Sequence, residues 1–365
     1  MNNQRLFSSL TAFIVACGLV PAAAEADGVL RQYYISAEEV DWDFAPLGRD
    51  EMMGMEFSDD QNVFVETSDT RIGSVYRMAQ YIGYENAEFT VPLTHADPST
   101  GILGPVIHAE VGDQIEIVFR NNTRVPTSIH PHGVFYDKAS EGAMTNDGTG
   151  MEDMMDAHVQ PGATYTYHWD VPERAGPGPN DESSVVWLYH SHADEVADTN
   201  SGLVGPMVIT AAGKANPDGS PMDVDQEVFS YFSVMNQNES LFFDQMLTSL
   251  AKMPDLNDEF EESNLMHAIN GYVFGNMPMP VLTEGTKVRW YMMSLGTEVD
   301  LHTPHWHGNT VLHEGHRKDV VELLPATTLV VDMWPDNPGI WMYHCHVNDH
   351  IAAGMTGRFE VAPAG

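Results

Sequence analysis

The sequence contains few basic side chains. Among its 365 residues, 16 are Lys or Arg and 53 are Asp or Glu, so the formal net charge at pH 7 is −37. A protein with such a negative field cannot neutralise a row of phosphates, which excludes nucleic-acid binding and disfavours docking on an anionic membrane surface. The chain is not disordered, because 43% of its residues are hydrophobic. The length suggests about two domains.

Cysteine is nearly absent, since Cys17 and Cys345 are the only two. Cys17 lies in an apolar run, residues 6–20, that follows Arg5 and precedes an alanine-rich stretch. This order predicts a signal peptide over residues 1–26 and therefore an exported protein, either periplasmic or secreted. The run is too short to span a membrane. In an alternative interpretation, residues 14–17 form a lipobox and Cys17 carries a lipid anchor.

Long helical patterns are also missing. Short β-rich runs, separated by Gly, Pro and Asn, predict an all-β fold of antiparallel sandwiches. Short helices are expected over residues 193–198 and 241–253. The β-rich runs are residues 114–119, 164–169, 204–209, 287–292, 328–333 and 356–361.

An internal repeat divides the chain. Residues 187–192 (Trp-Leu-Tyr-His-Ser-His) match 341–346 (Trp-Met-Tyr-His-Cys-His), and 130–133 (His-Pro-His-Gly) match 305–308 (His-Trp-His-Gly). One copy of each motif in each half indicates two domains of similar architecture. We expect a first domain over residues 27–213, a linker rich in Gly, Pro and Asp over 214–223, and a second domain over 224–365.

Ten of the 17 histidines lie in four tight clusters. Residues i and i+2 of a strand point to the same face, so each His-x-His pair can hold a metal ion from one side. A single isolated His-x-His pair usually has no metal-binding role and lies at the surface or in the core by chance. Four such pairs, repeated in the two halves of the chain, indicate metal binding. The clustered histidines are His130, His132, His190, His192, His302, His305, His307, His344, His346 and His350.

Cys345 stands between His344 and His346 and must therefore face the opposite side of its strand. After signal cleavage it would have no cysteine to pair with, so its role needs another explanation. His350 and Met355 follow where they can join it. With His302, these residues offer a thiolate, two imidazoles and a weak thioether, which is the ligand set of a blue-copper electron-transfer site. The other eight clustered histidines would suffice for three coppers that bind and reduce dioxygen.

The four clusters resemble the copper signature of the multicopper oxidases, and the resemblance covers nearly the whole mature chain. Residues 31–43, 104–110, 201–206 and 262–271 are similar to the cupredoxin domains of the ceruloplasmin and hephaestin type, whereas the two-domain arrangement resembles the small laccases. The resemblance implies two Greek-key cupredoxin sandwiches. It also implies an enzyme that couples four one-electron oxidations to the reduction of dioxygen to water.

The resemblance further implies four copper ions per chain, one of type 1, one of type 2 and two of type 3. Ser191 stands where a type 1 site in the first domain would need cysteine, so only the second domain would be blue. In the two-domain relatives a homotrimer places each trinuclear cluster between subunits. Type 1 copper would take His302, Cys345, His350 and Met355, type 2 copper His130 and His305, and the type 3 pair His132, His190, His192, His307, His344 and His346.

Dioxygen reduction needs protons, which carboxylates or a phenol near the cluster would supply. Tyr136 and Glu141 match positions of the small laccases, and Asp194 lies two residues after His192. Tyr136 could instead be an ordinary buried tyrosine. These three residues are the candidate proton-transfer groups.

The sequence favours one reductant but leaves two alternatives. Glu262, His267 and Asp349, with Glu298, match the iron site of ceruloplasmin-type ferroxidases, and carboxylates with one imidazole suit Fe(II) and hold Fe(III) more strongly. Fe(II) is therefore the preferred substrate, and a laccase acting on phenols and aromatic amines is the alternative. Cu(I) oxidation is a third hypothesis, because soft thioethers cluster at Met52, Met53, Met55, Met144, Met151, Met154 and Met155.

Two other classes of protein fit the histidine clusters less well. A copper nitrite reductase is also two-domain and trimeric, but it needs one blue site and one copper held by three histidines, fewer than are present. A non-enzymatic copper store or structural module would tolerate the loss of ligands, yet all twelve positions are filled. We expect dioxygen and a small reductant as partners, with no nucleic acid.

Overall fold

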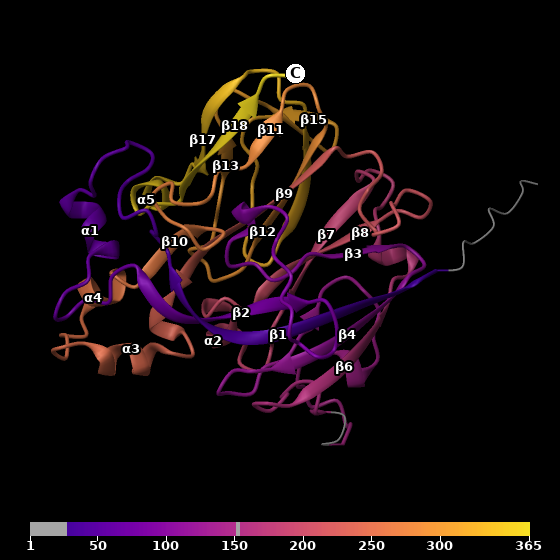
Figure 1. Cartoon of the computed structure of the whole chain (residues 1–365), viewed down its shortest axis with the longest axis horizontal. Coiled ribbons are helices and arrows are strands. Elements are labelled where there is room, and N and C mark those ends of the chain that lie inside the picture. The colour runs from indigo at the N-terminus through magenta and orange to yellow at the C-terminus, as the bar shows by residue number, and fades with distance from the viewer. Residues whose placement is uncertain (1–27, 151–153) are drawn as a thin grey trace, which may run out of the picture.

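Figure 1 shows a computed structural model of the chain, which describes residues 28–150 and 154–365. The expected signal peptide, the alternative lipobox with Cys17, and Met151 lie outside the described residues. The described strands form four sheets, and each sheet takes all its strands from one half of the chain. The all-β fold expected from the sequence is confirmed, with short helices in the connections.

The first half contributes two four-stranded sheets. One has the order β2-β1-β4-β6, and the other has the order β3-β8-β7-β5. Strand 114–121 alternates partly exposed and buried side chains, as expected for a sheet with one face on a core. The strands are β1 (Leu30–Asp43), β2 (Val75–Tyr84), β3 (Ile107–Glu110), β4 (Gln114–Asn121), β5 (His130–Pro131), β6 (Thr164–Asp170), β7 (Ser184–His190) and β8 (Val204–Thr210).

The second half repeats this plan. A six-stranded sheet has the order β10-β9-β12-β16-β14-β15, and a four-stranded sheet has the order β11-β18-β17-β13. The strands are β9 (Gln226–Asn236), β10 (Leu265–Ile269), β11 (Val281–Thr283), β12 (Val288–Ser294), β13 (Pro304–Trp306), β14 (Val311–His313), β15 (His316–Lys318), β16 (Thr328–Met333), β17 (Gly339–Cys345) and β18 (Thr356–Ala362).

The repeated motifs occupy equivalent strand pairs. β5 pairs antiparallel with β7, with His130 opposite His190, and β13 pairs antiparallel with β17, with His305 opposite His344. Because register fixes which side chains share a face, each half brings its own histidine combs together. All six β-rich runs expected from the sequence fall on strands, with boundaries that differ by at most two residues.

The helices are short and differ from expectation. The helix expected over 193–198 begins two residues later, because the Asp194 side chain caps it by accepting from the Ala197 backbone amide. The one expected over 241–253 is limited to seven residues. The described helices are α1 (Asp59–Val65), α2 (Glu195–Asn200), α3 (Phe243–Ser249), α4 (Asp258–Glu262) and α5 (Asn348–Ala352). None of the described helices is long and apolar enough to cross a membrane.

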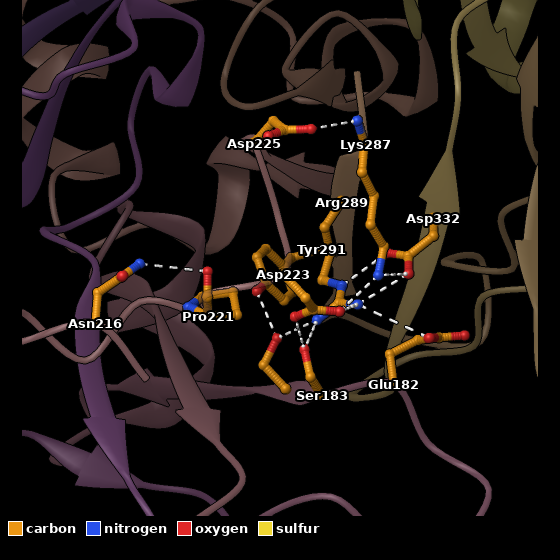
Figure 2. Close-up of polar contacts among 11 residues, drawn as sticks. Glu182, Ser183, Asn216, Pro221, Asp223, Asp225, Lys287, Arg289, Tyr291 and Asp332 are labelled. Carbon is orange, nitrogen blue, oxygen red and sulfur yellow. Dashed lines mark hydrogen bonds and ion pairs between the residues drawn. The ribbon is translucent and has the colours of Figure 1, made fainter. Parts of the chain in front are cut away.

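A buried charged network joins the two halves (Figure 2). Arg289 on β12 is fully buried and donates to both carboxylate oxygens of Asp332 on β16, at 2.7 and 2.8 Å. Its third nitrogen donates to the hydroxyls of Ser183 and Ser184, where β7 begins. Lys287 lies 2.9 Å from the same Asp332 carboxylate. The strand that carries His190 is thereby fixed to the sheet of the second half.

A segment of the first half covers part of the second. Residues 44–74 connect β1 to β2 and include α1, which lies beside α5 and β10 in Figure 1. Phe44 and Phe64 of this segment pack in one buried cluster with Met266 and Phe274 of the second half. The segment thus lies over the region of the second half that contains the Cys345 site.

Candidate metal centres

Three groups of metal-binding side chains have their donor atoms within 4.8 Å of one another in the described part of the chain. Two groups contain only histidines, one from each half, and the third contains the cysteine. All nine of these residues belong to the clusters identified from the sequence. The groups are His130, His132 and His190; His305, His307 and His344; and His302, Cys345 and His350.

In the first half, four imidazoles gather at the end of β5 and β7. His132 Nε2 lies 3.1 Å from His190 Nε2, and the His192 ring centroid is 5.3 Å from that of His130. His130 Nδ1 lies 2.6 Å from the carbonyl oxygen of Glu141, and His190 Nδ1 lies 3.0 Å from that of Ser191. A carbonyl can only accept, so these contacts place the proton on Nδ1 and leave Nε2 free to bind a metal.

In the second half, the imidazoles of His305, His307, His344 and His346 gather in the same way. His344 Nε2 lies 3.0 Å from His307 Nε2 and 3.2 Å from His305 Nδ1, and His344 Nδ1 lies 2.6 Å from the Cys345 carbonyl oxygen. His346 adds a ring 5.3 Å from that of His305. Beside His305 and His307 is a polar cavity of about 430 Å³ that also contacts Asp319 and Asp336.

Metal binding explains these histidine arrangements better than hydrogen bonds between the rings do. Two nitrogens converge on His344 Nε2, which has one lone pair and, with the proton on Nδ1, no hydrogen to give. Burial lowers the pKa of His344 and of His132 to about 4 and that of His190 to about 3, so all three rings are neutral near pH 7. Neutral imidazoles with convergent lone pairs are the form that coordinates metal ions.

The cysteine site lies on the other face of β17. Cys345 Sγ is 3.6 Å from His350 Nδ1 and 3.9 Å from His302 Nδ1, and those two nitrogens are 3.1 Å apart. Cys345, His302 and His350 are all buried. Met355 belongs to the same buried cluster as Cys345, and its carbonyl oxygen accepts from the Cys345 amide at 3.1 Å. The structure therefore brings together the thiol and the two imidazoles that the sequence singled out, and it places Met355 in the same buried cluster.

The thiol at this site is activated. Burial opposes ionisation, but the hydrogen bonds from His302 and His350 outweigh it and lower the Cys345 pKa to about 6. Burial likewise acts to lower the His302 pKa, yet the Asp300 carboxylate and Cys345 raise it. The site favours a thiolate at neutral pH, which is the form that binds copper. Asp300 is a contact of His302 that sequence reasoning missed, although it lies only two residues before it.

The two histidine sets do not meet within one chain. The ring contacts of His130, His132, His190 and His192 in the described structure connect them to one another and to Tyr136, not to the histidines of the second half. The histidines of the second half similarly contact one another. Each set is thus built by one half of the chain alone.

A buried hydrogen-bond network supports the first-half histidines from behind. Ser191, in the position equivalent to Cys345, donates to Asp198 Oδ2 at 2.5 Å and accepts from the Ser128 amide at 3.0 Å. Ser128 Oγ in turn accepts from the His192 amide. Burial raises the Asp198 pKa to about 6. Sequence reasoning missed Asp198, because an acid near the start of a short helix gives no local signal of its burial.

The candidate proton-transfer residues lie at different distances from the first-half histidines. The Tyr136 ring is 5.9 Å from that of His130, and burial, followed by the charge of Glu141, raises the Tyr136 pKa. The Glu141 carbonyl orients His130, but its carboxylate pairs with Lys138 at 2.5 Å. Asp194 is exposed and caps α2. The carboxylate beside His192 Nε2 belongs to Glu195, at 3.2 Å, and was missed by sequence reasoning.

The four candidate substrate-binding residues surround the Cys345 site unevenly. His267 on β10 is buried, and its ring centroid is 5.3 Å from that of His350. Its Nδ1 lies 3.0 Å from the Leu265 carbonyl oxygen, so Nε2 carries the lone pair. Asp349 is exposed on α5 directly before His350. Glu262 ends α4 and Glu298 lies in a loop; both are exposed, and neither shares a tight donor group with His267 in the described structure.

The methionine clusters are largely at the surface. Met53 and Met55 lie in the segment that covers the second half and are 70% and 62% exposed. Met52 of the same segment packs against Gly275, whose amide donates to Thr356, next to Met355. Met144 and Met155 are exposed in a separate loop of the first half.

Two sandwiches of this topology, with a Cys-His-His-Met set on the back of a strand that presents the metal-binding His344 on its other face, define a cupredoxin-type copper protein. Two family models, each described as multicopper oxidase, match residues 99–214 and 246–365, which together make up well over half of the chain. The chain belongs to the multicopper oxidase family. Copper is accordingly its cofactor, and the donor sets described above fit it.

Several curated proteins are similar in sequence. The chain is 41% identical over 359 residues to ferroxidase HEPHL1 of Mus musculus, 39% identical over 372 residues to hephaestin of Rattus norvegicus, and 37% identical over 345 residues to ceruloplasmin of Homo sapiens. These matches cover 96%, 99% and 91% of the chain but only 30%, 32% and 32% of the relatives. The chain therefore spans about a third of their length.

Solved structures share the fold. The multicopper oxidase mgLAC superposes with a TM-score of 0.58 at 19% identity, covering 92% of this chain and 87% of that one. The blue copper oxidase from Nitrosomonas europaea gives a TM-score of 0.55 at 17% identity, covering 91% and 86%. The expected pair of cupredoxin sandwiches is thereby supported.

Proposed function

We propose that the protein is a multicopper oxidase that oxidises Fe(II) to Fe(III) and reduces dioxygen to water. The observation that carries this proposal is strand β17, which presents Cys345 to a buried blue-copper ligand set on one face and His344 to a histidine set on the other. The names of the similar ferroxidases support iron as the reductant. Each Fe(II) gives up one electron, so four ions and four protons are needed to turn one dioxygen into two waters.

We propose four coppers per chain, with type 1 copper held by His302, Cys345, His350 and Met355. Copper bound at these sites would supply one-electron transfer at the cysteine and dioxygen reduction at the histidines. The backbone joins Cys345 directly to His344 and His346, so adjacent residues serve the two kinds of site. Type 2 copper would bind His130 and His305, and the type 3 pair would bind His132, His190, His192, His307, His344 and His346.

We further propose a homotrimer in which the first-half histidines of one copy face the second-half histidines of the next. The separation of the two half-sites within a chain supports this assembly, because a complete trinuclear set then requires two copies. Beside Tyr136 lies a hollow of about 360 Å³, flanked by Phe135 and Leu30, which are 52% and 55% exposed. These apolar side chains would be covered in the trimer.

Complementation between subunits tests this assembly. His132→Ala and His307→Ala each damage every cluster of a homotrimer. When the two chains are co-expressed, a mixed trimer regains an intact cluster wherever an unmutated first half meets an unmutated second half. Recovery of oxidase activity is expected for this pair and not for the control pair His132→Ala with His190→Ala, in which both changes lie in the first half. Equal lack of recovery in both pairs would contradict a cluster shared between subunits.

Proton supply is assigned to Tyr136, Glu141 and Asp194. Tyr136 has the best position, because its ring contacts that of His130. Glu141 orients His130 through its carbonyl and adds a carboxylate on the same side. Asp194 is close in sequence to His192 and would deliver protons from the surface.

The substrate ion would bind near His350. His267 provides an imidazole lone pair next to that ligand, while Asp349, Glu262 and Glu298 provide the carboxylates. Hard oxygens stabilise Fe(III) more than Fe(II), which favours loss of the electron. The exposure of the three acids suits an ion that must enter and leave during each turnover.

The substrate assignment is tested by comparing kcat/KM for Fe(II), Cu(I) and a phenol. In the double variant Glu262→Ala with Asp349→Ala, kcat/KM for Fe(II) should fall on the order of ten-fold or more, since about 1.4 kcal/mol of transition-state stabilisation would be lost. The phenol value should stay within about two-fold, as should the Fe(II) value of the control Glu85→Ala with Asp244→Ala, which removes two exposed acids elsewhere. Unchanged Fe(II) turnover in the test variant would reject the iron site.

We also propose that the mature protein is exported after loss of residues 1–26, into the periplasm or the medium. Within it, residues 27–213 and 224–365 would form the two cupredoxin domains, joined by 214–223. The first domain would contribute only to the trinuclear cluster, because Ser191 replaces the cysteine. N-terminal sequencing of the purified protein tests the cleavage site.

A further inference from the structure

A buried carboxylate lies directly behind one ligand of the Cys345 site. Asp300 is 1% exposed, and its Oδ1 is 3.2 Å from His302 Nε2. The same side chain accepts from the backbone amides of Val234 at 2.7 Å and Thr297 at 2.9 Å. All three contacts bring a donor to the carboxylate, and no Lys or Arg pairs with it among the described residues.

The backbone around Asp300 is shaped to hold it. Gly296 has φ +126°, and a Cβ at that residue would lie 2.0 Å from Asp300 Oδ2. Only glycine therefore leaves room for the carboxylate at this turn. The Thr297 amide of this turn holds Oδ2, and the Val234 amide of β9 holds Oδ1, the oxygen that faces His302. His302 in turn directs Nδ1 toward His350 Nδ1 and Cys345 Sγ.

The internal repeat provides a comparison within the molecule. Matching His130 to His305 places Thr127 opposite His302 and Val125 opposite Asp300. The first half therefore lacks both the ligand and the acid, just as it lacks the cysteine. The carboxylate occurs only in the half that has a cysteine site, which indicates a role in that site and not in the sandwich fold.

We propose that Asp300 is a positioning residue that orients His302 and lowers the reduction potential of the Cys345 copper site, matching it to Fe(II) held by carboxylates and disfavouring phenols. This inference rests on the proposed function for its choice of substrate. A negative charge hydrogen-bonded to a ligand makes that imidazole a stronger donor and stabilises Cu(II) relative to Cu(I). The buried position leaves this charge poorly screened by solvent.

The two imidazole ligands are therefore unequal. His302 has the Asp300 carboxylate behind it, whereas His350 has the His267 ring beside it, with the ring centroids 5.3 Å apart. Electrons from the substrate would enter on the His350 side, where Asp349 is exposed. The His302 side would set the potential. Carboxylate-bound Fe(II) is a strong enough reductant for a low-potential site, while phenols need a more oxidising one.

The test is a redox titration of the blue absorption band in copper-loaded wild type, Asp300→Asn and Glu322→Gln. Asn keeps the size of the side chain and one acceptor oxygen but removes the charge. Glu322 is the matched control, because it is 75% exposed yet next to Leu323, which pairs with the His302 backbone. We expect the potential to rise in Asp300→Asn with the blue band retained, and to stay at the wild-type value in Glu322→Gln.

Turnover provides the second readout. In Asp300→Asn, the ratio of kcat/KM for phenol to that for Fe(II) should increase relative to wild type. A potential equal to that of wild type in a blue Asp300→Asn protein would overturn the inference. If the Asp300→Asn protein does not fold, Gly296→Ala is measured instead, because the added Cβ displaces the Asp300 carboxylate without removing it. In this variant too, a raised reduction potential supports the inference and an unchanged reduction potential rejects it.

The potential is measured without iron, so the two proposals can fail separately. A raised potential in a protein that does not oxidise Fe(II) would leave the role of Asp300 intact and reject the proposed substrate. An unchanged reduction potential in a protein that oxidises Fe(II) would reject the role of Asp300 and leave the proposed substrate intact.

Discussion

The buried pair Arg289–Asp332 leads to a quantitative prediction. Asp332→Ala leaves a fully buried guanidinium without its bidentate partner. Breaking a buried pair typically lowers the free energy of unfolding by about 3–5 kcal/mol. Asp223 and Glu182 lie 3.7 and 3.8 Å from Arg289 and partly replace the lost carboxylate, so we expect about 3 kcal/mol. That corresponds to roughly a hundred-fold change in the folding equilibrium.

The effect should also reach the copper sites selectively. Arg289 donates to Ser183 and Ser184 at the start of β7, and β7 ends at His190. Loosening this attachment should reduce copper occupancy at the histidine sets more than the blue absorption at Cys345, which the second half forms by itself.

The assay is urea unfolding followed by tryptophan fluorescence, with copper analysis of the folded protein. Glu322→Ala is the control, since its pair with Lys318 is exposed and should contribute only about 0.3–0.5 kcal/mol. A loss below about 1 kcal/mol for Asp332→Ala would contradict this prediction, because a buried guanidinium that is only partly compensated by Asp223 and Glu182 should cost more.

Three further predictions concern single residues. Cys345→Ser should abolish the blue absorption band and substrate oxidation while leaving the protein folded, as circular dichroism and oxygen uptake would show. Burial raises the pKa of Asp198 to about 6 in the folded protein, above its unfolded value of about 4. Its contribution to stability is therefore complete below pH 4 and is lost as the pH rises through 6. Asp198→Asn should flatten the pH dependence of the urea unfolding midpoint between pH 4 and 6. Tyr136→Phe should lower kcat for dioxygen reduction by about ten-fold to a hundred-fold with the blue band unchanged, whereas an unaltered kcat would remove Tyr136 from proton transfer.

Much of the metal chemistry could be predicted from sequence because it depends on local periodicity. The alternation of side chains along a strand was enough to place Cys345 and His344 on opposite faces of β17. The repeat of the His-x-His motifs indicated two halves of similar architecture, and the structure places the motifs on equivalent strand pairs, with His130 opposite His190 and His305 opposite His344.

Contacts that depend on distant folding could not be predicted in this way. Asp300 and Asp198 are two of 53 acids, and only the burial of their side chains separates them from solvated ones. Glu195 and not Asp194 contacts His192, because α2 begins with Asp194 as its cap and turns the next side chain toward the ring. The joining of the two halves through Arg289 likewise required a three-dimensional structure.

The central claim is that the protein couples iron oxidation to the complete reduction of dioxygen. Parallel measurement of Fe(III) formation and oxygen consumption by the copper-loaded protein tests it most directly. We predict four Fe(III) formed per dioxygen consumed, with no hydrogen peroxide released. A ratio of two with peroxide, or an Fe(II) oxidation rate no higher than that of the Cys345→Ser protein, would contradict the account.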